Sequence, residues 1–177
     1  KIIFEPGRSI VGNAGYLLSK IIYIKKTRNI NFIIIDAGMN DLMRPALYKA
    51  YHRIIPTKKN VNKIRKRHEF VGPVCETTDK FLSTKSFQKL NEGDNIVLCD
   101  VGAYGKTLSS NYNLRTSADE ILIKNSKVKR IKRKEKLRDI IWEMIRGLIF
   151  KFFFYIGTIA VCLIFLPALI LPQKVML

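Results

Sequence analysis

The stretch Phe32-Ile33-Ile34-Ile35-Asp36-Ala37-Gly38 is the clearest structural signal in the chain. Its apolar run, followed by an acidic residue and a small turn, predicts a buried strand that ends at Asp36. Asn40–Tyr48 is expected to form one or two helical turns despite Pro45. Further strands are expected at Tyr16–Ile24, His52–Ile55, Glu69–Val71, Asn95–Val101 and Ala118–Ile123, with a tight turn at Gly93-Asp94. Short strands at such spacing predict a mainly β domain, a barrel or a sandwich.

The chain is strongly basic, with 32 Lys and Arg, 14 Asp and Glu and a formal net charge of +18. Such a charge normally suggests nucleic acid or an anionic lipid surface as a partner. Much of it lies between Lys124 and Arg138, in a stretch from residue 124 to 143 that we expect to be helical. Because no aromatic side chains alternate with the basic ones, no nucleic-acid partner is expected.

The three cysteines, Cys75, Cys99 and Cys162, are widely spaced along the chain. Their odd number and spacing suit neither a disulfide framework nor a metal site, so no metal is expected. The expected location is the reducing cytoplasm.

Residues 147–171 are almost wholly apolar. As a helix rising 1.5 Å per residue, this segment would cross a hydrocarbon layer about 30 Å thick. Lys151 could extend to the interface, and Pro167 could kink the far end. The basic stretch precedes the segment and only Lys174 follows it, which predicts a cytoplasmic N-terminal side. A buried core helix is the alternative, but the length and the aromatic run Phe152–Tyr155 favour a transmembrane helix.

Five short motifs occur in a fixed order in the first part of the chain. They are Glu5-Pro6-Gly7-Arg8, Ala37-Gly38-Met39-Asn40-Asp41-Leu42-Met43-Arg44-Pro45, Tyr48, Gly72-Pro73-Val74-Cys75-Glu76 with Asp79, and Gly102-Ala103-Tyr104-Gly105 with Ser109-Ser110-Asn111-Tyr112-Asn113. Taken singly they are ordinary: a turn, a solvated arginine, a core aromatic, a buried thiol. Together, residues 2–142 resemble the C-terminal part of the diaminopimelate decarboxylases, pyridoxal 5'-phosphate (PLP) enzymes of the alanine-racemase-like class.

The resemblance implies decarboxylation of meso-2,6-diaminopimelate to L-lysine and CO₂. It places Glu5, Pro6, Gly7, Arg8 and Tyr104 at the cofactor. Gly7 would let backbone N–H groups approach the phosphate closely, and a helix start near Ser9 would favour its negative charge.

The resemblance also implies a set of substrate-binding side chains: Arg8, Arg44, Tyr48, Glu76 and Tyr104. An arginine binds a carboxylate through two parallel hydrogen bonds, and an acidic side chain suits the distal ammonium group of the substrate.

Cys75 matches the family's proton donor, since a thiol with an ordinary pKa of about 8.5 is mostly protonated at neutral pH. In the family this cysteine and the following Glu76 come from the neighbouring subunit, which implies a homodimer with a shared site. Cys99 lies in an apolar strand and is assigned a structural role. Thr77-Thr78 departs from the family's usual Ser-Gly, but Asp79 is retained, so the loop is expected to persist.

The expected fold class is α+β. Residues 1–30 would end a PLP-binding (β/α)₈ barrel, residues 31–142 would form a mainly antiparallel β domain, and residues 143–177 would form the hydrophobic segment. The lysine that holds the cofactor would lie in barrel residues preceding this chain, so the 177 residues alone should be inactive and poorly soluble.

The C-terminal tail has a separate resemblance. Met144-Ile145-Arg146-Gly147, the aromatic run, Leu166-Pro167 and Leu171-Pro172 are similar to the N-terminus of bacterial 1-acylglycerol-3-phosphate acyltransferases, without their His-x-x-x-x-Asp motif. Fused reading frames and a true membrane anchor both remain open. The functional alternatives are a related PLP decarboxylase of another basic amino acid or polyamine precursor, and a membrane-tethered vestigial or binding module.

Overall fold

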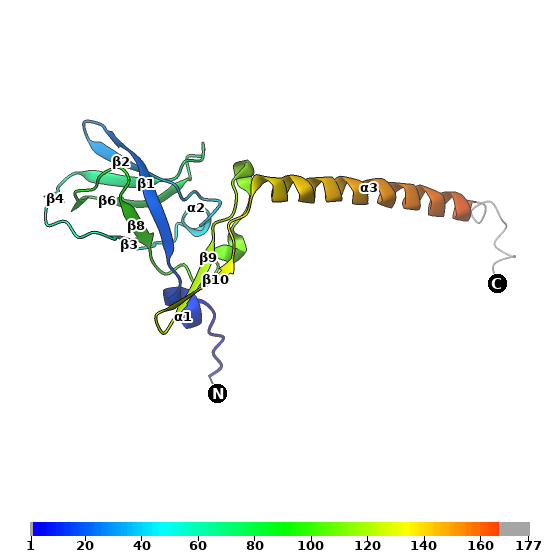
Figure 1. The fold of residues 1–177 in the computed structure, drawn as a ribbon, viewed down its shortest axis with the longest axis horizontal. Coiled ribbons are helices and arrows are strands. Elements are labelled where there is room, and N and C mark those ends of the chain that lie inside the picture. The colour runs from blue at the N-terminus through cyan, green and yellow to red at the C-terminus, as the bar shows by residue number, and fades with distance from the viewer. Residues whose placement is uncertain (1, 167–177) are drawn as a thin grey trace. The chain divides into compact units, whose positions relative to one another are not determined.

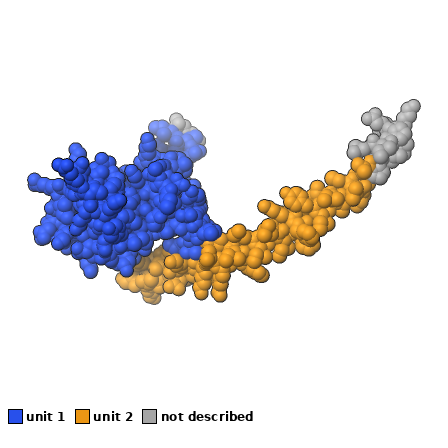
Figure 2. Space-filling view, turned by 90° about the horizontal axis from the view of Figure 1, so that it is seen from above, with its two compact units in different colours: residues 1–118 blue, residues 119–177 orange. Residues whose placement is uncertain are grey.

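The computed structural model describes residues 2–166. The chain divides into two compact units, residues 1–118 and residues 119–177, which are coloured separately in Figure 2.

A six-stranded sheet forms the body of the first unit (Figure 1). Its strand order is β3-β8-β1-β2-β5-β6, and every neighbouring pair is antiparallel except β2 with β5. Its strands are β1 (Leu17–Lys26), β2 (Ile30–Ile35), β3 (Ile54–Pro56), β5 (Arg67–Val71), β6 (Lys80–Thr84) and β8 (Asn95–Leu98). The unit also contains the β4–β7 pair (Lys63–Ile64, Phe87–Gln88), the helices α1 (Arg8–Val11) and α2 (Arg44–Tyr48), and the 3-10 turns η1 (Gly12–Ala14), η2 (Lys106–Leu108) and η3 (Tyr112–Leu114).

The buried strand predicted at Phe32–Asp36 is β2, which lies between β1 and β5. Alternate residues of β2 are buried, and Ile33 and Ile35 are almost fully enclosed. The core around them is built from aliphatic and aromatic side chains of the neighbouring strands: Ile21, Phe70, Ile96 and Leu98. This burial of apolar surface is the main favourable contribution to the fold.

Strand β1 and the turn at Gly93-Asp94 can be compared with the predictions. β1 falls inside the segment 1–30 that was predicted to end the cofactor-binding barrel, and here it pairs with β2 and β8. The domain boundaries themselves stay predictions. The turn predicted at Gly93-Asp94 is present, because Gly93 has a φ of +86° and the Asp94 N–H donates to the Asn91 carbonyl at 3.2 Å.

Gly102 brings α1 and η1 against the chain that follows β8. The N–H of Gly102 donates to the Gly12 carbonyl at 2.9 Å, and the N–H of Val101 donates to the Gly15 carbonyl at 3.0 Å. A Cβ atom on Gly102 would lie 2.0 Å from the Val11 carbonyl oxygen, so only glycine permits this approach. The contact fixes the segment before α1 next to the loop after β8.

The helix predicted over residues 124–143 is wrong in its first part. Residues 124–136 are not helical: β9 (Glu120–Lys124) and β10 (Lys127–Lys132) form an antiparallel hairpin. Asn125 and Ser126 join them with φ values of 48° and 59°, the left-handed pair that a two-residue hairpin turn requires. Lysine-rich composition suits an exposed strand as well as an exposed helix, so composition alone could not decide.

Helix α3 (Leu137–Phe165) has 29 residues, and its side chains are mostly exposed. The Lys136 N–H donates to Asp139 Oδ2 at 3.0 Å and closes the first turn. By length and composition alone, α3 is long and apolar enough to cross a membrane. It overlaps the apolar segment predicted at 147–171. Pro167, Leu171-Pro172 and Lys174 lie outside the described residues.

We expect Gly102→Ala to destabilise the protein by about 1–3 kcal/mol, because the added methyl group must displace the Val11 backbone. The matched control is Gly147→Ala in α3, where an added Cβ meets nothing within 4 Å. That change should be neutral or stabilising by up to about 1 kcal/mol. Urea unfolding of the purified full-length protein measures both variants. Equal midpoints for the two would contradict the close-approach explanation.

Candidate functional site

An arginine and two tyrosines form the centre of the candidate site. Arg44 begins α2, and its guanidinium carbon lies 5.5 Å from the centre of the Tyr48 ring and 5.7 Å from that of Tyr104. Tyr48 lies near Arg44 because residues four apart share one face of a helix. The two rings therefore hold the cation through cation–π contacts rather than through an opposing charge. Arg44 Nε is buried and has no hydrogen-bond partner among residues 2–166.

The N-terminal motif lies beside this centre. A Cβ atom on Gly7 would lie 3.0 Å from Tyr104 Oη, so the chain passes directly against the phenol. Arg8 Nη2 donates to the Asp100 carbonyl at 3.3 Å, while Glu5 is exposed. The predicted helix start is present, one residue earlier than Ser9, but α1 has only four residues. Its dipole can contribute little, so binding of an anion here would depend on N–H groups and arginines.

Backbone geometry marks the Tyr104 loop as unusual. Tyr104 has a φ of 58°, and Asp100, whose carbonyl Arg8 binds, has a φ of 61°. Non-glycine residues rarely adopt the left-handed region, and such positions concentrate at functional sites. The sequence motif pointed to Tyr104, but it did not predict this conformation.

His52 is a residue of this region that the sequence analysis did not single out. It is fully buried, and its Nδ1 lies 2.9 Å from the Cys99 carbonyl oxygen. Nδ1 therefore carries the proton, which leaves Nε2 as a buried acceptor without a partner in the described part of the chain. Burial lowers the pKa of His52, and the charges of Arg8 and Arg44 lower it further. His52 is thus mainly neutral at pH 7. It precedes β3 and lies next to Arg53 in the sequence, and this local sequence does not indicate its burial or its hydrogen bond.

The thiol loop between β5 and β6 is organised by Asp79. Asp79 is buried, and its two carboxylate oxygens accept the Met39 N–H at 2.7 Å and the Val74 N–H at 2.8 Å. Burial raises the pKa of Asp79, and these two N–H groups oppose that shift. The loop predicted from Asp79 is thus present. Neither Thr77 nor Thr78 has a positive φ, so threonine fits where the family usually has glycine.

The loop presents Cys75 and Glu76 at the surface, where both are exposed. Tyr112 Oη donates to Glu76 Oε1 at 2.5 Å. This hydrogen bond to the carboxylate is the main reason that the pKa of Tyr112 is raised. Tyr112 belongs to the Ser109–Asn113 motif, to which the sequence analysis gave no individual role.

The predicted site residues therefore form two groups. Gly7, Arg8, Arg44, Tyr48 and Tyr104 lie together, and Cys75 and Glu76 lie together with Tyr112. Across residues 2–166, the structure shows no hydrogen bond, ion pair or ring contact between the groups. Over the same residues, no three His, Cys, Asp or Glu side chains gather as a metal site would need.

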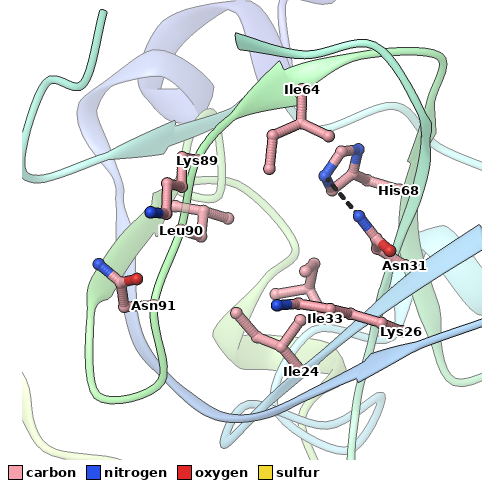
Figure 3. A pocket seen from close by; sticks show the side chains of 9 residues that line it. All are labelled: Ile24, Lys26, Asn31, Ile33, Ile64, His68, Lys89, Leu90 and Asn91. Carbon is pink, nitrogen blue, oxygen red and sulfur yellow. Dashed lines mark hydrogen bonds between the residues drawn. The ribbon is translucent and has the colours of Figure 1, made fainter. Parts of the chain in front are cut away.

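A separate small hollow lies over β1, β2 and β5 (Figure 3). Asn31 Nδ2 donates to His68 Nε2 at 3.4 Å inside it, since His68 Nδ1 is engaged with the Lys66 carbonyl at 2.7 Å. Its walls are mainly apolar, from Ile24, Ile33, Ile64 and Leu90. None of the residues that line it belongs to the two groups above.

Comparison with known proteins identifies related sequences. The family model described as "Pyridoxal-dependent decarboxylase, C-terminal sheet domain" matches residues 9–102. A diaminopimelate decarboxylase of Aquifex aeolicus is 45% identical over 137 residues, covering 76% of this chain and 32% of the relative. One from Haemophilus influenzae is 44% identical over 140 residues, covering 79% and 34%. The chain thus spans about a third of the length of the curated relatives it matches.

Solved structures give the same relationship. The diaminopimelate decarboxylase of Helicobacter pylori, complexed with L-lysine, aligns with a TM-score of 0.73 at 40% identity, covering 81% of this chain and 35% of that one. A lysine decarboxylase of Selenomonas ruminantium aligns with a TM-score of 0.56 at 24% identity, covering 64% and 29%, which shows a shared fold alone. Because the family model spans more than half of the 177 residues, this chain belongs to the pyridoxal-dependent decarboxylases and contains their C-terminal sheet domain.

Proposed function

We propose that this chain is the C-terminal part of an enzyme that decarboxylates meso-2,6-diaminopimelate to L-lysine and CO₂. The observation that carries the proposal is the gathering of Arg44, Tyr48 and Tyr104 beside Gly7 and Arg8. Relatives at 44–45% identity bear the name diaminopimelate decarboxylase, and the Helicobacter structure contains L-lysine, the product of this reaction.

The residues present fit pyridoxal phosphate. Glu5–Arg8 and Tyr104 would hold it: Gly7 brings its backbone against the Tyr104 phenol, and Arg8 supplies a cation for the phosphate. Bound there, the cofactor withdraws electrons from the carbon that loses CO₂. The protein's task is then to orient the substrate and to supply a proton.

Arg44 is proposed to bind the carboxylate at the substrate centre that does not react. Its guanidinium lies over the Tyr48 and Tyr104 rings, and its buried Nε–H has no partner among the residues that the structure describes. Substrate binding would give this donor an acceptor, which a buried polar group needs. Glu76 would bind the distal ammonium group, and Cys75 would deliver its thiol proton to the carbon that has lost CO₂.

The two residue groups favour a site shared between subunits. Cys75 and Glu76 are exposed in the protomer and have no contact with the group around Arg44 in residues 2–166. We propose a homodimer in which these residues complete the partner's site. In the whole enzyme, residues 1–30 would end a (β/α)₈ barrel and residues 31–142 would form the β domain, in the cytoplasm.

The tail is a separate proposal. α3 has the length and composition of a membrane-crossing helix, and its apolar side chains are exposed. We propose that residues 147–171 contact a lipid bilayer wherever the tail is part of the mature protein. This would make the enzyme membrane-associated. The similarity to the start of an acyltransferase offers the other origin, a fused reading frame.

The full-length holoenzyme should release CO₂ from meso-diaminopimelate at least about tenfold faster, as kcat/KM, than from lysine, ornithine or arginine. Arg44→Lys should lower kcat/KM by about ten- to a hundredfold, because an ammonium group cannot form the paired hydrogen bonds of a guanidinium. Coupled CO₂ assays measure both. A preference for another basic amino acid would support the related-decarboxylase alternative instead.

A mixture of two inactive variants tests the shared site. Cys75→Ala and Arg44→Ala homodimers should each lose at least about 90% of activity. If the partner supplies Cys75, subunit exchange should create one intact site per heterodimer and restore up to about a quarter of wild-type activity. Mixed Cys75→Ala and Cys75→Ser proteins serve as the control and should recover nothing. No recovery in the first mixture, with exchange verified, contradicts sharing.

Removal of residues 145–177 tests the tail. If the tail binds the bilayer, the intact protein should sediment with membranes, and the truncated one should remain in the supernatant with its decarboxylase activity unchanged. Cell fractionation followed by the CO₂ assay gives both results. If the intact protein were found wholly in the supernatant, the membrane proposal would be contradicted, and the proposed decarboxylase function would be unaffected.

A further inference from the structure

We infer that Tyr112 is a positioning residue. It would hold the Glu76 carboxylate in the orientation in which this group binds the distal ammonium group of the substrate. The inference rests on the proposed function, and it names a side chain for which the motif itself gave no role. Tyr112 would act on the substrate only through Glu76.

The first observation is the bond between the two side chains. Tyr112 Oη donates to Glu76 Oε1 at 2.5 Å across 36 residues of sequence. Both side chains are exposed, so an unrestrained glutamate there would sample many rotamers. A hydrogen bond to one carboxylate oxygen restricts those rotamers and leaves the other oxygen, Oε2, to accept a hydrogen bond from an ammonium group.

The second observation is that the Tyr112 loop is fixed to the turn that follows β2. The Ser110 N–H donates to the Asn40 carbonyl at 2.9 Å. Arg115, at the other end of the loop, donates from Nε to Asn40 Oδ1 at 2.9 Å and from Nη2 to the Asp36 carbonyl at 2.5 Å. Its guanidinium also lies 3.6 Å from the Asp41 carboxylate. Both ends of the loop are thus tied to residues 36–41.

The third observation is that the Glu76 loop is fixed to the same turn. Asp79 accepts the Met39 N–H through one oxygen and the Val74 N–H through the other. Within the loop, the Asp79 N–H donates to the Glu76 carbonyl at 3.1 Å. Both loops are hydrogen-bonded to the same turn, residues 36–41. The fold therefore sets the separation of Tyr112 and Glu76, and their contact is not a chance meeting of two mobile side chains.

Steady-state kinetics of the full-length holoenzyme test the inference. Tyr112→Phe should raise KM for meso-diaminopimelate about tenfold while kcat changes less than about twofold, since a charge-assisted hydrogen bond is removed from a group that only binds. Glu76→Ala, which removes the acceptor of the Tyr112 hydrogen bond, should also raise KM. In the double variant, Tyr112→Phe should add less than about twofold, because its effect passes through Glu76. Cofactor absorbance should be unchanged throughout.

The matched control is Tyr23→Phe, an exposed tyrosine of β1, which should alter neither constant. Additive effects in the double variant, or an unchanged KM in Tyr112→Phe, would overturn the inference while leaving the proposed function intact. A fall in kcat with a lowered unfolding midpoint would show a structural role and overturn it too. If the wild-type enzyme has no activity on meso-diaminopimelate, the proposed function itself fails.

Discussion

The buried carboxylate of Asp79 is the interaction on which the arrangement of the thiol loop depends. One of its oxygens accepts a backbone N–H from the turn after β2, at Met39, and the other accepts one from the loop after β5, at Val74. A charged group is buried only when such donors offset its loss of hydration. Gly72 is also required there, since a Cβ on it would lie 2.3 Å from the carboxylate. These hydrogen bonds, together with the buried side chain of Val74, keep the loop in place.

A second constraint acts at the other group of residues. Gly102 and Gly15 allow two backbone segments to touch, and that contact brings the segment before α1 beside Tyr104. Neither constraint depends on the cofactor. The protein thus places its cations and its thiol through backbone hydrogen bonds and close glycine contacts, which is the preorganisation that catalysis by positioning requires.

Predictions from the sequence succeeded where a short local pattern is compatible with few structures. The apolar run of β2 and the Gly93-Asp94 turn were predicted, because apolar patterning and turn chemistry are local. The Asp79 loop was expected from the family resemblance, because Asp79 is retained. The strands β6 and β10 were missed. The lysines of β10 suit any exposed element, and the five residues of β6 become a strand through pairing with β5. The protonation pattern of His52 was missed for another reason: it follows from the Cys99 carbonyl, 47 residues away, which no local pattern encodes.

The charged residues of the site are kept from neutralising one another. Arg44 rests on two aromatic rings, Arg8 on a backbone carbonyl, and Glu76 on a phenol, so each has a neutral partner. In an ordinary structural ion pair, opposite charges neutralise each other, and neither is free to bind a ligand. A ligand with a carboxylate at one place and an ammonium group at another would supply opposite charges to the arginines and to Glu76. The proposed substrate, diaminopimelate, carries a carboxylate and an ammonium group at each end.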